Sequence, residues 1–251
     1  MGLKAGLRMR KMLTGSWITM GDGSIAEIMA QSGFDWLVVD MEHSAITLDI
    51  AQSLIRVIDS ADVVPLVRVG ENDATLIKRV MDAGAHGVIV PMVNSRSDAE
   101  NAVRAVRYPP DGIRGVGLTR AQGYGFCFNE YKKWAKKNAI VIVQIEHIDA
   151  IKNLESILNV DGVDGSIIGP YDLSGSLGYP GEFDRPIVKN AIARYELVCK
   201  KLGKPMGFHV VQPDVGKAKA YKKKGYSFLA VGLDTLYLGI KAREVLSEVC
   251  R

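Results

Sequence analysis

The sequence predicts an α/β protein folded as one (β/α)8 barrel, a TIM barrel, over residues 1–251. Short β-branched apolar segments alternate with longer segments of helical period along the whole chain. These short segments are nearly continuous in apolar character, which is typical of strands covered on both faces. Eight such repeats fill the chain and leave no room for a second domain. A doubly wound open sheet is the weaker alternative.

The eight expected strands are well separated. They cover residues 16–20, 36–40, 64–69, 87–92, 140–146, 165–170, 204–210 and 227–232. The helical segments between them carry start and stop signals, for example an Asn72 N-cap candidate before a helix that stops at Gly84. The stretch 108–137 contains Pro, Gly and aromatic residues, and we interpret it as a lid or a subunit contact.

Composition and charge limit the classes of partner. The 47% of hydrophobic residues and 24% of charged residues are ordinary for a soluble domain. The formal charge of +4 suits an anionic metabolite but is too small to argue for a polyanion. The lysine runs at 132–137 and 217–224 fall in helical segments, where they are expected on solvated faces. We therefore expect no nucleic-acid partner.

The cysteines and the first residues bear on the compartment. Cys127, Cys199 and Cys250 are odd in number and contain no C-x-x-C pair, which argues against a disulfide framework and a structural zinc site. The first residues show no apolar signal region, and no apolar run is long enough to span a membrane. These features favour a cytoplasmic protein with no membrane partner.

Polar side chains gather where the predicted strands end, which is where TIM barrels keep their chemistry. They are Asp40, Glu42 and His43 after the second strand, Arg68 in the third, Gln144 and Glu146 at the fifth, Asp172 after the sixth and His209 in the seventh. Gln144 and Glu146 share one face, because side chains alternate along a strand. The sequence therefore predicts one polar rim.

Two carboxylates of this rim suggest a metal site. Glu146 and Asp172 follow neighbouring strands, and two such oxygen donors, completed by substrate oxygens and water, suit an octahedral Mg²⁺ or Mn²⁺ ion, with Co²⁺ as a further possibility. No His₂–carboxylate or cysteine set favours zinc. The structural alternative for Glu146 is an ion pair with a lysine on the rim.

The remaining rim residues each have two interpretations. Arg68 could be a structural ion-pair partner of Asp40 or Glu42, or it could offer a bidentate fork to a substrate oxygen. His43 is the expected proton carrier, since the ordinary pKa of histidine lies near neutrality, with Asp40 orienting its ring. His209, at a strand end, is expected to line the pocket of the site. In contrast, His86 and His147 are interpreted as surface residues.

The turn after the sixth strand is a candidate anion site. In Gly169-Pro170-Tyr171-Asp172, glycine lets a ligand approach the backbone and proline can start a helical turn. The free N–H groups of that turn could receive a substrate carboxylate.

Over almost its full length the chain resembles the class II pyruvate aldolases of the HpcH/HpaI family. The matching stretches, in order, are GFDWLVVDMEH, PLVRV, LIKRVMDAGAHGVIVPMV, RYPPDGIRGVG, VQIE, VDGVDGSIIGPYDLSGSLG and FLAVGLDT. The resemblance implies a TIM barrel assembled as a homohexamer, a trimer of dimers, often with the last helix exchanged between neighbouring subunits.

The resemblance also implies roles for individual residues. Glu146 and Asp172 would bind the divalent metal, Arg68 and Gln144 would contact pyruvate, and Asp40 with His43 would form the acid–base dyad. The N–H groups of Tyr171 and Asp172 would hold the pyruvate carboxylate, and Trp17 would line the pocket. Glu42 and Asp82 would lie near the water shell of the metal. Tyr171 and His209 depart from the family, which often has alanine and an apolar residue there.

The implied reaction is cleavage of a 4-hydroxy-2-oxo acid to pyruvate and an aldehyde through a metal-stabilised pyruvate enolate, an EC 4.1.2-type lyase activity. The enzyme alternative is a citrate-lyase-β-like or malyl-CoA-lyase-like protein that acts on a CoA thioester. A Schiff-base aldolase is disfavoured, because no lysine ends a predicted strand and Lys204 begins one. The non-enzyme alternative is a catalytically silent barrel that binds a ligand.

Overall fold

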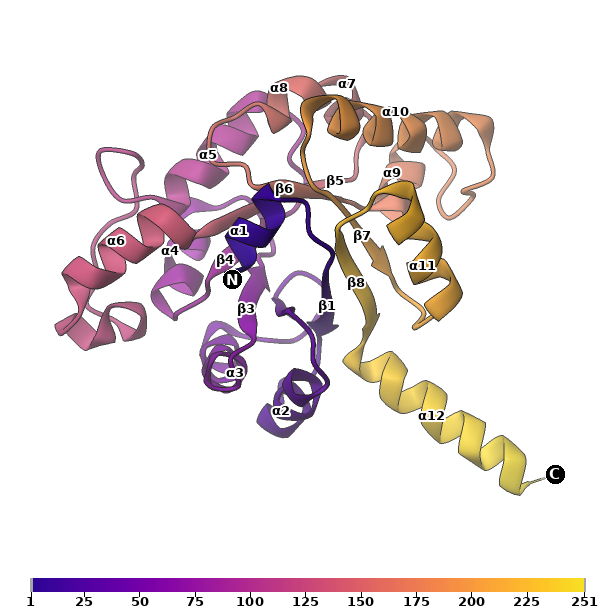
Figure 1. Cartoon of the computed structure of the whole chain (residues 1–251), viewed down its shortest axis with the longest axis horizontal. Helices are drawn as coiled ribbons and strands as arrows, with labels where there is room; N and C mark the ends of the chain where they lie inside the picture. The colour runs from indigo at the N-terminus through magenta and orange to yellow at the C-terminus, as the bar shows by residue number, and fades with distance from the viewer. Residues whose placement is uncertain (1, 251) are drawn as a thin grey trace.

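The computed structural model describes residues 2–250 and shows a closed barrel of parallel strands (Figure 1). The strands are β1 Leu13–Ile18, β2 Trp36–Asp40, β3 Val64–Arg68, β4 Gly87–Val90, β5 Ile140–Ile145, β6 Gly165–Ile168, β7 Met206–Val210 and β8 Phe228–Leu233. Each strand pairs with the next in sequence, and β8 pairs with β1. This closure confirms the predicted TIM barrel and excludes the open sheet.

Helices follow the strands and surround the barrel (Figure 1). They are α1 Leu3–Arg8, α2 Gly23–Gln31, α3 Leu48–Ser60, α4 Ala74–Asp82, α5 Arg96–Val106, the 3-10 helix η1 Arg120–Gly125, α6 Phe128–Asn138, α7 Ile148–Lys152, α8 Leu154–Leu158, α9 Pro170–Ser176, α10 Pro186–Leu202, α11 Val215–Lys224 and α12 Asp234–Val249. Helix α4 is capped by Asp73 and not by the predicted Asn72, since the Asp73 side chain accepts the N–H of Leu76.

The first strand begins three residues earlier than predicted, at Leu13. Gly15 interrupts the apolar pattern there and hides the start of the strand. It is required by packing, because a Cβ atom at this position would lie 2.1 Å from the Trp36 ring. Trp36 in turn stacks on Phe228 across the barrel interior, with ring centroids 4.1 Å apart.

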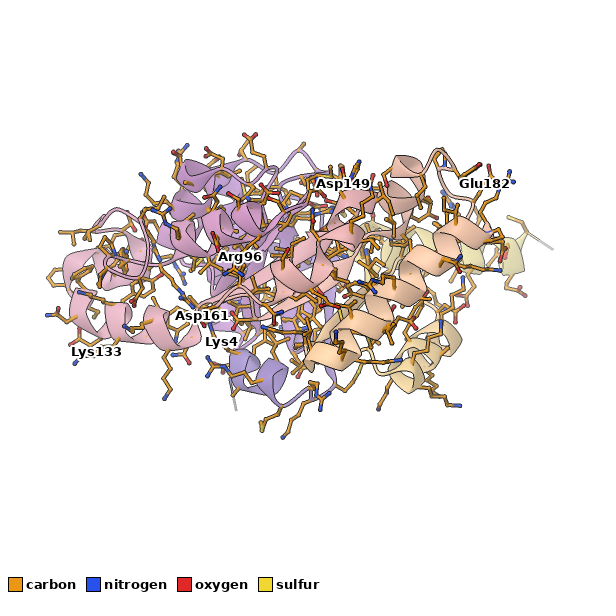
Figure 2. All side chains as sticks on the ribbon, turned by 90° about the horizontal axis from the view of Figure 1, so that it is seen from above. Lys4, Arg96, Lys133, Asp149, Asp161 and Glu182 are labelled. Atoms are coloured by element: carbon orange, nitrogen blue, oxygen red, sulfur yellow. The ribbon has the colours of Figure 1, made fainter. Side chains whose placement is uncertain are left out.

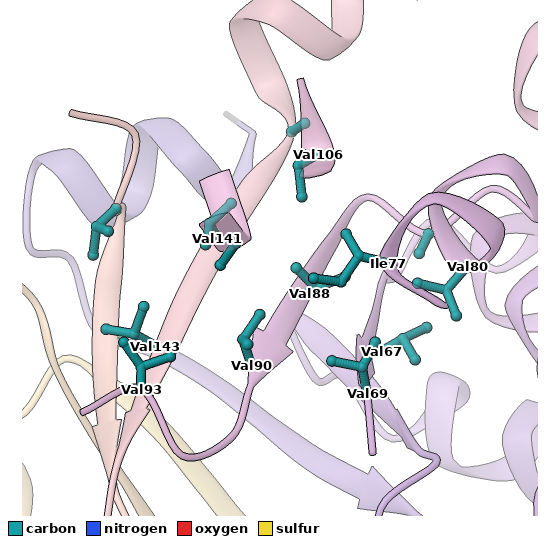
Figure 3. Close-up of a cluster of buried hydrophobic side chains, with 14 of the residues drawn as sticks. Val67, Val69, Ile77, Val80, Val88, Val90, Val93, Val106, Val141 and Val143 are labelled. Carbon is teal, nitrogen blue, oxygen red and sulfur yellow. The ribbon is translucent and has the colours of Figure 1, made fainter. Parts of the chain in front are cut away.

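Side chains alternate between the inside of the barrel and the layer under the helices. Along β5, Ile140 and Ile142 belong to the interior cluster, whereas Val141 and Val143 belong to the outer cluster. Figure 3 shows part of the outer cluster, which includes valines of β3, β4 and β5 and Ile77 of α4. The same alternation places Gln144 inside the barrel at the carboxyl end of β5.

Helix α1 closes the amino-terminal end of the barrel. Leu3 and Leu7 join the interior cluster, and Lys4 is buried beside them. The Lys4 ammonium donates to the Ala139 carbonyl and lies 3.0 Å from Asp164 Oδ2. Asp164, which directly precedes β6, also accepts the N–H of Val141 in β5, so this ion pair connects α1 to the amino-terminal ends of two strands.

Lys4→Met is expected to lower the free energy of unfolding by about 3 kcal/mol, because it leaves the Asp164 carboxylate buried without its counter-charge. Denaturant unfolding followed by circular dichroism measures this loss. The double variant Lys4→Met/Asp164→Asn should recover part of it. Lys132→Met, at an exposed lysine of α6, is the control and should change stability by less than about 0.5 kcal/mol. Equal stabilities of Lys4→Met and this control would contradict the role of the pair.

The lysine runs lie on exposed faces of α6 and α11, as predicted. Lys133 projects from α6 at the edge of the molecule (Figure 2). The stretch 108–137 folds as a loop, η1 and α6 around a buried guanidinium, that of Arg114. Large apolar side chains of this stretch remain exposed, among them Leu118, Tyr124 and Phe126.

Helix α12 leaves the barrel instead of packing against its side (Figure 1). Of its side chains only Asp234, at its first residue, is buried. Its apolar residues Leu238, Val245, Leu246 and Val249 are exposed. Within residues 2–250, no helix has the length and apolar character needed to cross a membrane.

Candidate active site

The carboxyl ends of β2, β3, β5 and β6 bring the predicted rim residues together. Asp40 and Arg68 are direct register partners in the β2–β3 pair, so both side chains emerge on the same side of the sheet. Gln144 of β5 is the register partner of Ile167 in β6, and Glu146 and Gly169 follow directly after these strands. The site is therefore built on rigid neighbouring strands.

Arg68 is held by two carboxylates. Its Nε and Nη2 donate to Asp40 at 2.9 and 2.6 Å, and its Nη1 lies 3.0 Å from Glu42 Oε2. The guanidinium also lies over the Trp17 ring, 4.6 Å from the ring centroid. Burial alone would raise the pKa of Asp40, but the contacts with Arg68 hold it below its usual value. Arg68 therefore forms the ion pair that was one of its two interpretations, and it does so with both Asp40 and Glu42.

Among residues 2–250 the structure shows no hydrogen bond between the Asp40 carboxylate and the His43 ring, and the acid–base dyad of these two residues stays a prediction. Asp40 Oδ1 accepts the backbone N–H of His43 at 3.2 Å, whereas the His43 Nε2 atom lies 3.9 Å from Glu42. The physical reason is the β2–β3 register, which places the Arg68 fork directly beside Asp40. The His43 side chain is 66% exposed and lines the mouth of the cavity.

Glu146 is buried and held in one orientation. Its Oε1 accepts the N–H of Met92 at 2.6 Å, and its Oε2 accepts a short hydrogen bond from the Gln144 amide. Burial raises the pKa of Glu146, these two hydrogen bonds oppose the rise, and the charge of Asp172 adds to it. A cation beside both carboxylates would relieve their repulsion.

Gly169 gives Glu146 the space that it occupies. A Cβ atom at Gly169 would lie 3.0 Å from Glu146 Cβ and 3.1 Å from its Oε2. Pro170 then starts α9 at the first helical position, and Asp172 lies in the first turn. The Gly-Pro turn therefore serves two purposes, because it admits the Glu146 carboxylate and brings Asp172 to the same place.

Two cavities meet at Tyr171 and Asp172. One of about 570 Å³ is lined by Met92, Glu146, His147, Tyr171, Asp172 and neighbouring residues of α9. The other, of about 720 Å³, includes Trp17, His43, Arg68, Gln144, Tyr171, Asp172 and His209 in its lining. The predicted metal ligands, the predicted substrate-binding residues and His43 therefore line one or both cavities. Asp40 and Glu42 line neither cavity and contact Arg68 instead.

The donor set fits a hard divalent cation that is only partly bound by protein. Among residues 2–250, no three His, Cys, Asp or Glu side chains are arranged to hold a metal ion. Glu146 and Asp172 supply two carboxylates that line one cavity. Mg²⁺ and similar ions are often held by one or two carboxylates, with substrate and water completing the octahedron. The two protein ligands proposed here are both carboxylates, and such oxygen donors match this pattern.

Glu42 is the most strongly shifted acid of the cluster. The pKa of Glu42 is raised to about 7, mainly by burial and also by the charges of Glu146, Asp40 and Asp172, while Arg68 opposes the rise. Because this folded-state pKa lies above the ordinary value, the folded protein binds the proton more tightly than the unfolded chain. Stability from this group is therefore present at low pH and is lost as the pH rises through about 7.

Glu42→Gln is accordingly expected to gain stability relative to the parent protein as the pH rises. In metal-free protein, the difference in unfolding free energy should grow by about 2 kcal/mol between about pH 5 and pH 8. Denaturant unfolding at several pH values, with EDTA present, measures it. A difference that does not change with pH would show that Glu42 keeps an ordinary pKa.

The structure also places three other residues that the sequence analysis discussed, two histidines and one aspartate. His147 caps α7, where its Nδ1 accepts the N–H of Asp149. His86 lies at the opposite end of the barrel, 3.2 Å from Asp59, as expected for a residue outside the site. Asp82 does not reach the metal site of its own chain, because it ends α4 at that opposite end and pairs with Arg114 at 2.6 Å.

Met92 is a site residue that the sequence analysis did not identify. Its φ of 51° is in the left-handed region, which is uncommon for a residue other than glycine. This conformation presents its N–H to Glu146. The only signal in the sequence is the proline that precedes it at a strand end.

The chain is similar to known proteins over most of its length. The model of the HpcH/HpaI aldolase/citrate lyase family matches residues 13–239. A hydroxypyruvate/pyruvate aldolase of Sagittula stellata is 42% identical over 232 residues, which are 92% of this chain and 90% of that protein. A 4-hydroxy-2-oxo-heptane-1,7-dioate aldolase of Escherichia coli is 39% identical over 246 residues, 97% of this chain and 92% of that protein.

A solved structure extends the comparison to the whole fold. A HpcH/HpaI aldolase/citrate lyase family protein from Burkholderia cenocepacia superposes with a TM-score of 0.94 at 36% identity, covering 99% of both chains. The matched family model, the relatives that align over most of the chain and the superposed barrel all indicate the same family. The chain belongs to the HpcH/HpaI aldolase/citrate lyase family.

Proposed function

We propose that the protein cleaves a 4-hydroxy-2-oxo acid into pyruvate and an aldehyde, with the help of a divalent cation, Mg²⁺ or Mn²⁺. The observation that carries the proposal is the convergence of Glu146 and Asp172 on one cavity, with Arg68 and Gln144 lining the adjoining one. Relatives named as pyruvate aldolases over nearly the full chain support this substrate class over a CoA thioester.

Each residue of the site has a separate proposed role in this reaction. Gln144 and Met92 fix the Glu146 carboxylate, so that it stands ready as a ligand. Glu146 and Asp172 would hold a divalent cation, and that cation would supply Lewis-acid stabilisation of negative charge on the substrate. Arg68 has two N–H groups left after its three carboxylate contacts, and these can donate to the 2-oxo oxygen. The N–H groups of Tyr171 and Asp172 are proposed to receive the pyruvate carboxylate.

His43 is proposed to move the proton. In the cleavage direction it removes the proton of the C4 hydroxyl, directly or through a water, from its exposed position at the cavity mouth. The electrons of the O–H bond form the aldehyde C=O, the C3–C4 bond breaks, and its electrons go to the pyruvate enolate. A proton returned to C3 then gives pyruvate. Glu42, 3.9 Å from His43 Nε2, stabilises the imidazolium that forms.

The first test is pyruvate release from a panel of 4-hydroxy-2-oxo acids with and without EDTA. EDTA should abolish release, and added Mg²⁺ or Mn²⁺ should restore it. Release that EDTA leaves unchanged would overturn the metal-dependent mechanism. An absence of release in metal-loaded protein from every compound, together with cleavage of a malyl-CoA-type thioester, would favour the alternative substrate class.

We also propose that the protein is a homohexamer in which α12 packs against a neighbouring subunit. One support is that α12 projects away from the barrel (Figure 1) and that its Leu238, Leu246 and Val249 are exposed. The other is an apolar groove of about 820 Å³ lined by residues of α12 and α2. Leu246→Glu should shift the mass measured by light scattering to smaller species. Arg243→Gln, at an exposed residue of α12 that does not line the groove, is the control and should leave the mass unchanged. A monomeric parent protein would contradict the proposal.

A cytoplasmic location completes the proposal. Its support is the state of the cysteines, since Cys127, Cys199 and Cys250 are all free thiols in the structure.

A further inference from the structure

We propose that His209 is a specificity-determining residue whose Nδ1 atom accepts a hydrogen bond from a substrate hydroxyl, so that the enzyme selects hydroxylated substrates over their deoxy analogues. The inference rests on the proposed aldolase function and names its substrate class. The hydroxyl belongs either to the aldehyde or to the 2-oxo acid, and the experiment below separates these sources.

The tautomer of His209 follows from its partner. Its Nε2 atom lies 2.9 Å from the carbonyl oxygen of Gly232, at the end of the neighbouring strand β8. A carbonyl oxygen can only accept, so Nε2 must carry the proton. In the neutral ring Nδ1 then carries a lone pair and can only accept.

The ring stays neutral at physiological pH. The pKa of His209 is lowered to about 4, mainly by burial and also by the positive charge of Arg68, while the Gly232 carbonyl and the charge of Asp40 oppose the change. His209 is thus a poor base and a poor cation near neutrality. Its remaining chemical capacity is that of a hydrogen-bond acceptor.

The acceptor atom faces the cavity. Among residues 2–250, no hydrogen bond is made to His209 Nδ1, and this atom is not one of the buried polar atoms that lack a partner. His209 lines the cavity of about 720 Å³ together with Trp17 and Arg68. Nδ1 is therefore open to whatever occupies that space.

The ring is held in place before substrate arrives. The hydrogen bond to Gly232 fixes one edge, and the Trp17 ring packs against it with centroids 5.3 Å apart. The rest of the cavity lining is largely apolar and includes Phe208, Ile167 and Tyr221, although Gln212 and Lys217 also contribute to it. A fixed acceptor in an apolar wall favours a ligand that brings a donor, since an analogue without the hydroxyl leaves Nδ1 unpaired.

The experiment measures selectivity between substrates that differ by one hydroxyl. The aldehyde pair is glycolaldehyde and acetaldehyde, each with pyruvate, and the 2-oxo acid pair is hydroxypyruvate and pyruvate, each with one aldehyde. For each pair the kcat/KM ratio of hydroxylated to deoxy substrate is compared between the parent protein and its variants. Exchange of the pyruvate C3 protons in D₂O serves as a separate measure of enolate formation.

Two substitutions separate the two ring nitrogens. His209→Gln places an amide near the Nε2 position, which keeps a donor for Gly232 and removes the Nδ1 acceptor. His209→Asn places an amide oxygen near the Nδ1 position and loses the Gly232 contact. The ratio should fall about tenfold in His209→Gln, the value of one net hydrogen bond, and should be partly kept in His209→Asn. His86→Gln, at the opposite end of the barrel, is the control and should leave the ratio unchanged.

The outcomes are distinct. A fall for the aldehyde pair alone places the hydroxyl on the aldehyde, and a fall for the 2-oxo acid pair alone places it on the nucleophile; either result supports the inference. Ratios in His209→Gln equal to those of the parent for both pairs would overturn it. Absence of metal-dependent proton exchange in the parent protein would instead refute the proposed aldolase function.

Discussion

Asp172→Asn is expected to reduce pyruvate release by at least about a thousandfold, because it removes one of the two carboxylates proposed to bind the cation. Asp172 is the more informative of the two ligands to change. It is exposed at the first turn of α9, whereas Glu146 is buried and hydrogen-bonded to Met92 and Gln144. Because Asp172 is exposed, its substitution by the similarly sized asparagine should leave the fold intact.

Two measurements accompany the activity assay of Asp172→Asn. Isothermal titration with Mn²⁺ should show weaker binding, and the rise in melting temperature that Mn²⁺ produces in the parent protein should be lost. The melting temperature of the metal-free variant should match that of the parent. Asp161→Asn, at a carboxylate that pairs with Arg107 outside both cavities, is the matched control. Activity of Asp172→Asn within tenfold of the parent would show that Asp172 is not a metal ligand.

The position of these carboxylates was predictable because it depends on chain order and strand geometry alone. Glu146 and Asp172 follow consecutive strands, and the carboxyl ends of parallel strands meet at one end of a barrel. The Gly169-Pro170 turn was recognisable from residue type. Its second effect, the space that Gly169 leaves for Glu146, depends on a distance between segments that the sequence does not contain.

Contacts set by register were not predictable from the sequence. Asp40 and His43 are close in sequence, which suggested a pair, but the side chain beside Asp40 belongs to Arg68 on the next strand. Asp82 matched an acidic site position in sequence, yet within one chain the length of α4 takes it to the far end of the barrel. Met92 acts through its backbone N–H, and every residue except proline has this group, so the residue type does not reveal the role.

Arg68→Lys is expected to lower pyruvate C3 proton exchange by about a hundredfold, because a single ammonium cannot replace a fork that contacts Asp40 and Glu42 and still donates to an oxyanion. The substitution keeps the positive charge, so a loss of this size reports on geometry. The variant should also be less stable, since the Asp40 carboxylate is buried and loses one of its two contacts with the guanidinium.

Stability and catalysis must therefore be separated, and the chain offers a matched control in Arg114. This buried arginine donates through Nε and Nη2 to Asp82, but at the opposite end of the barrel. Arg114→Lys should lose a similar amount of stability while the folded protein keeps its proton-exchange rate per molecule. If Arg68→Lys behaved in the same way, Arg68 would be a structural ion-pair partner only. A selective loss of exchange in Arg68→Lys would show that the fork acts on the substrate, because both variants weaken a buried ion pair and only one of these pairs borders the cavity.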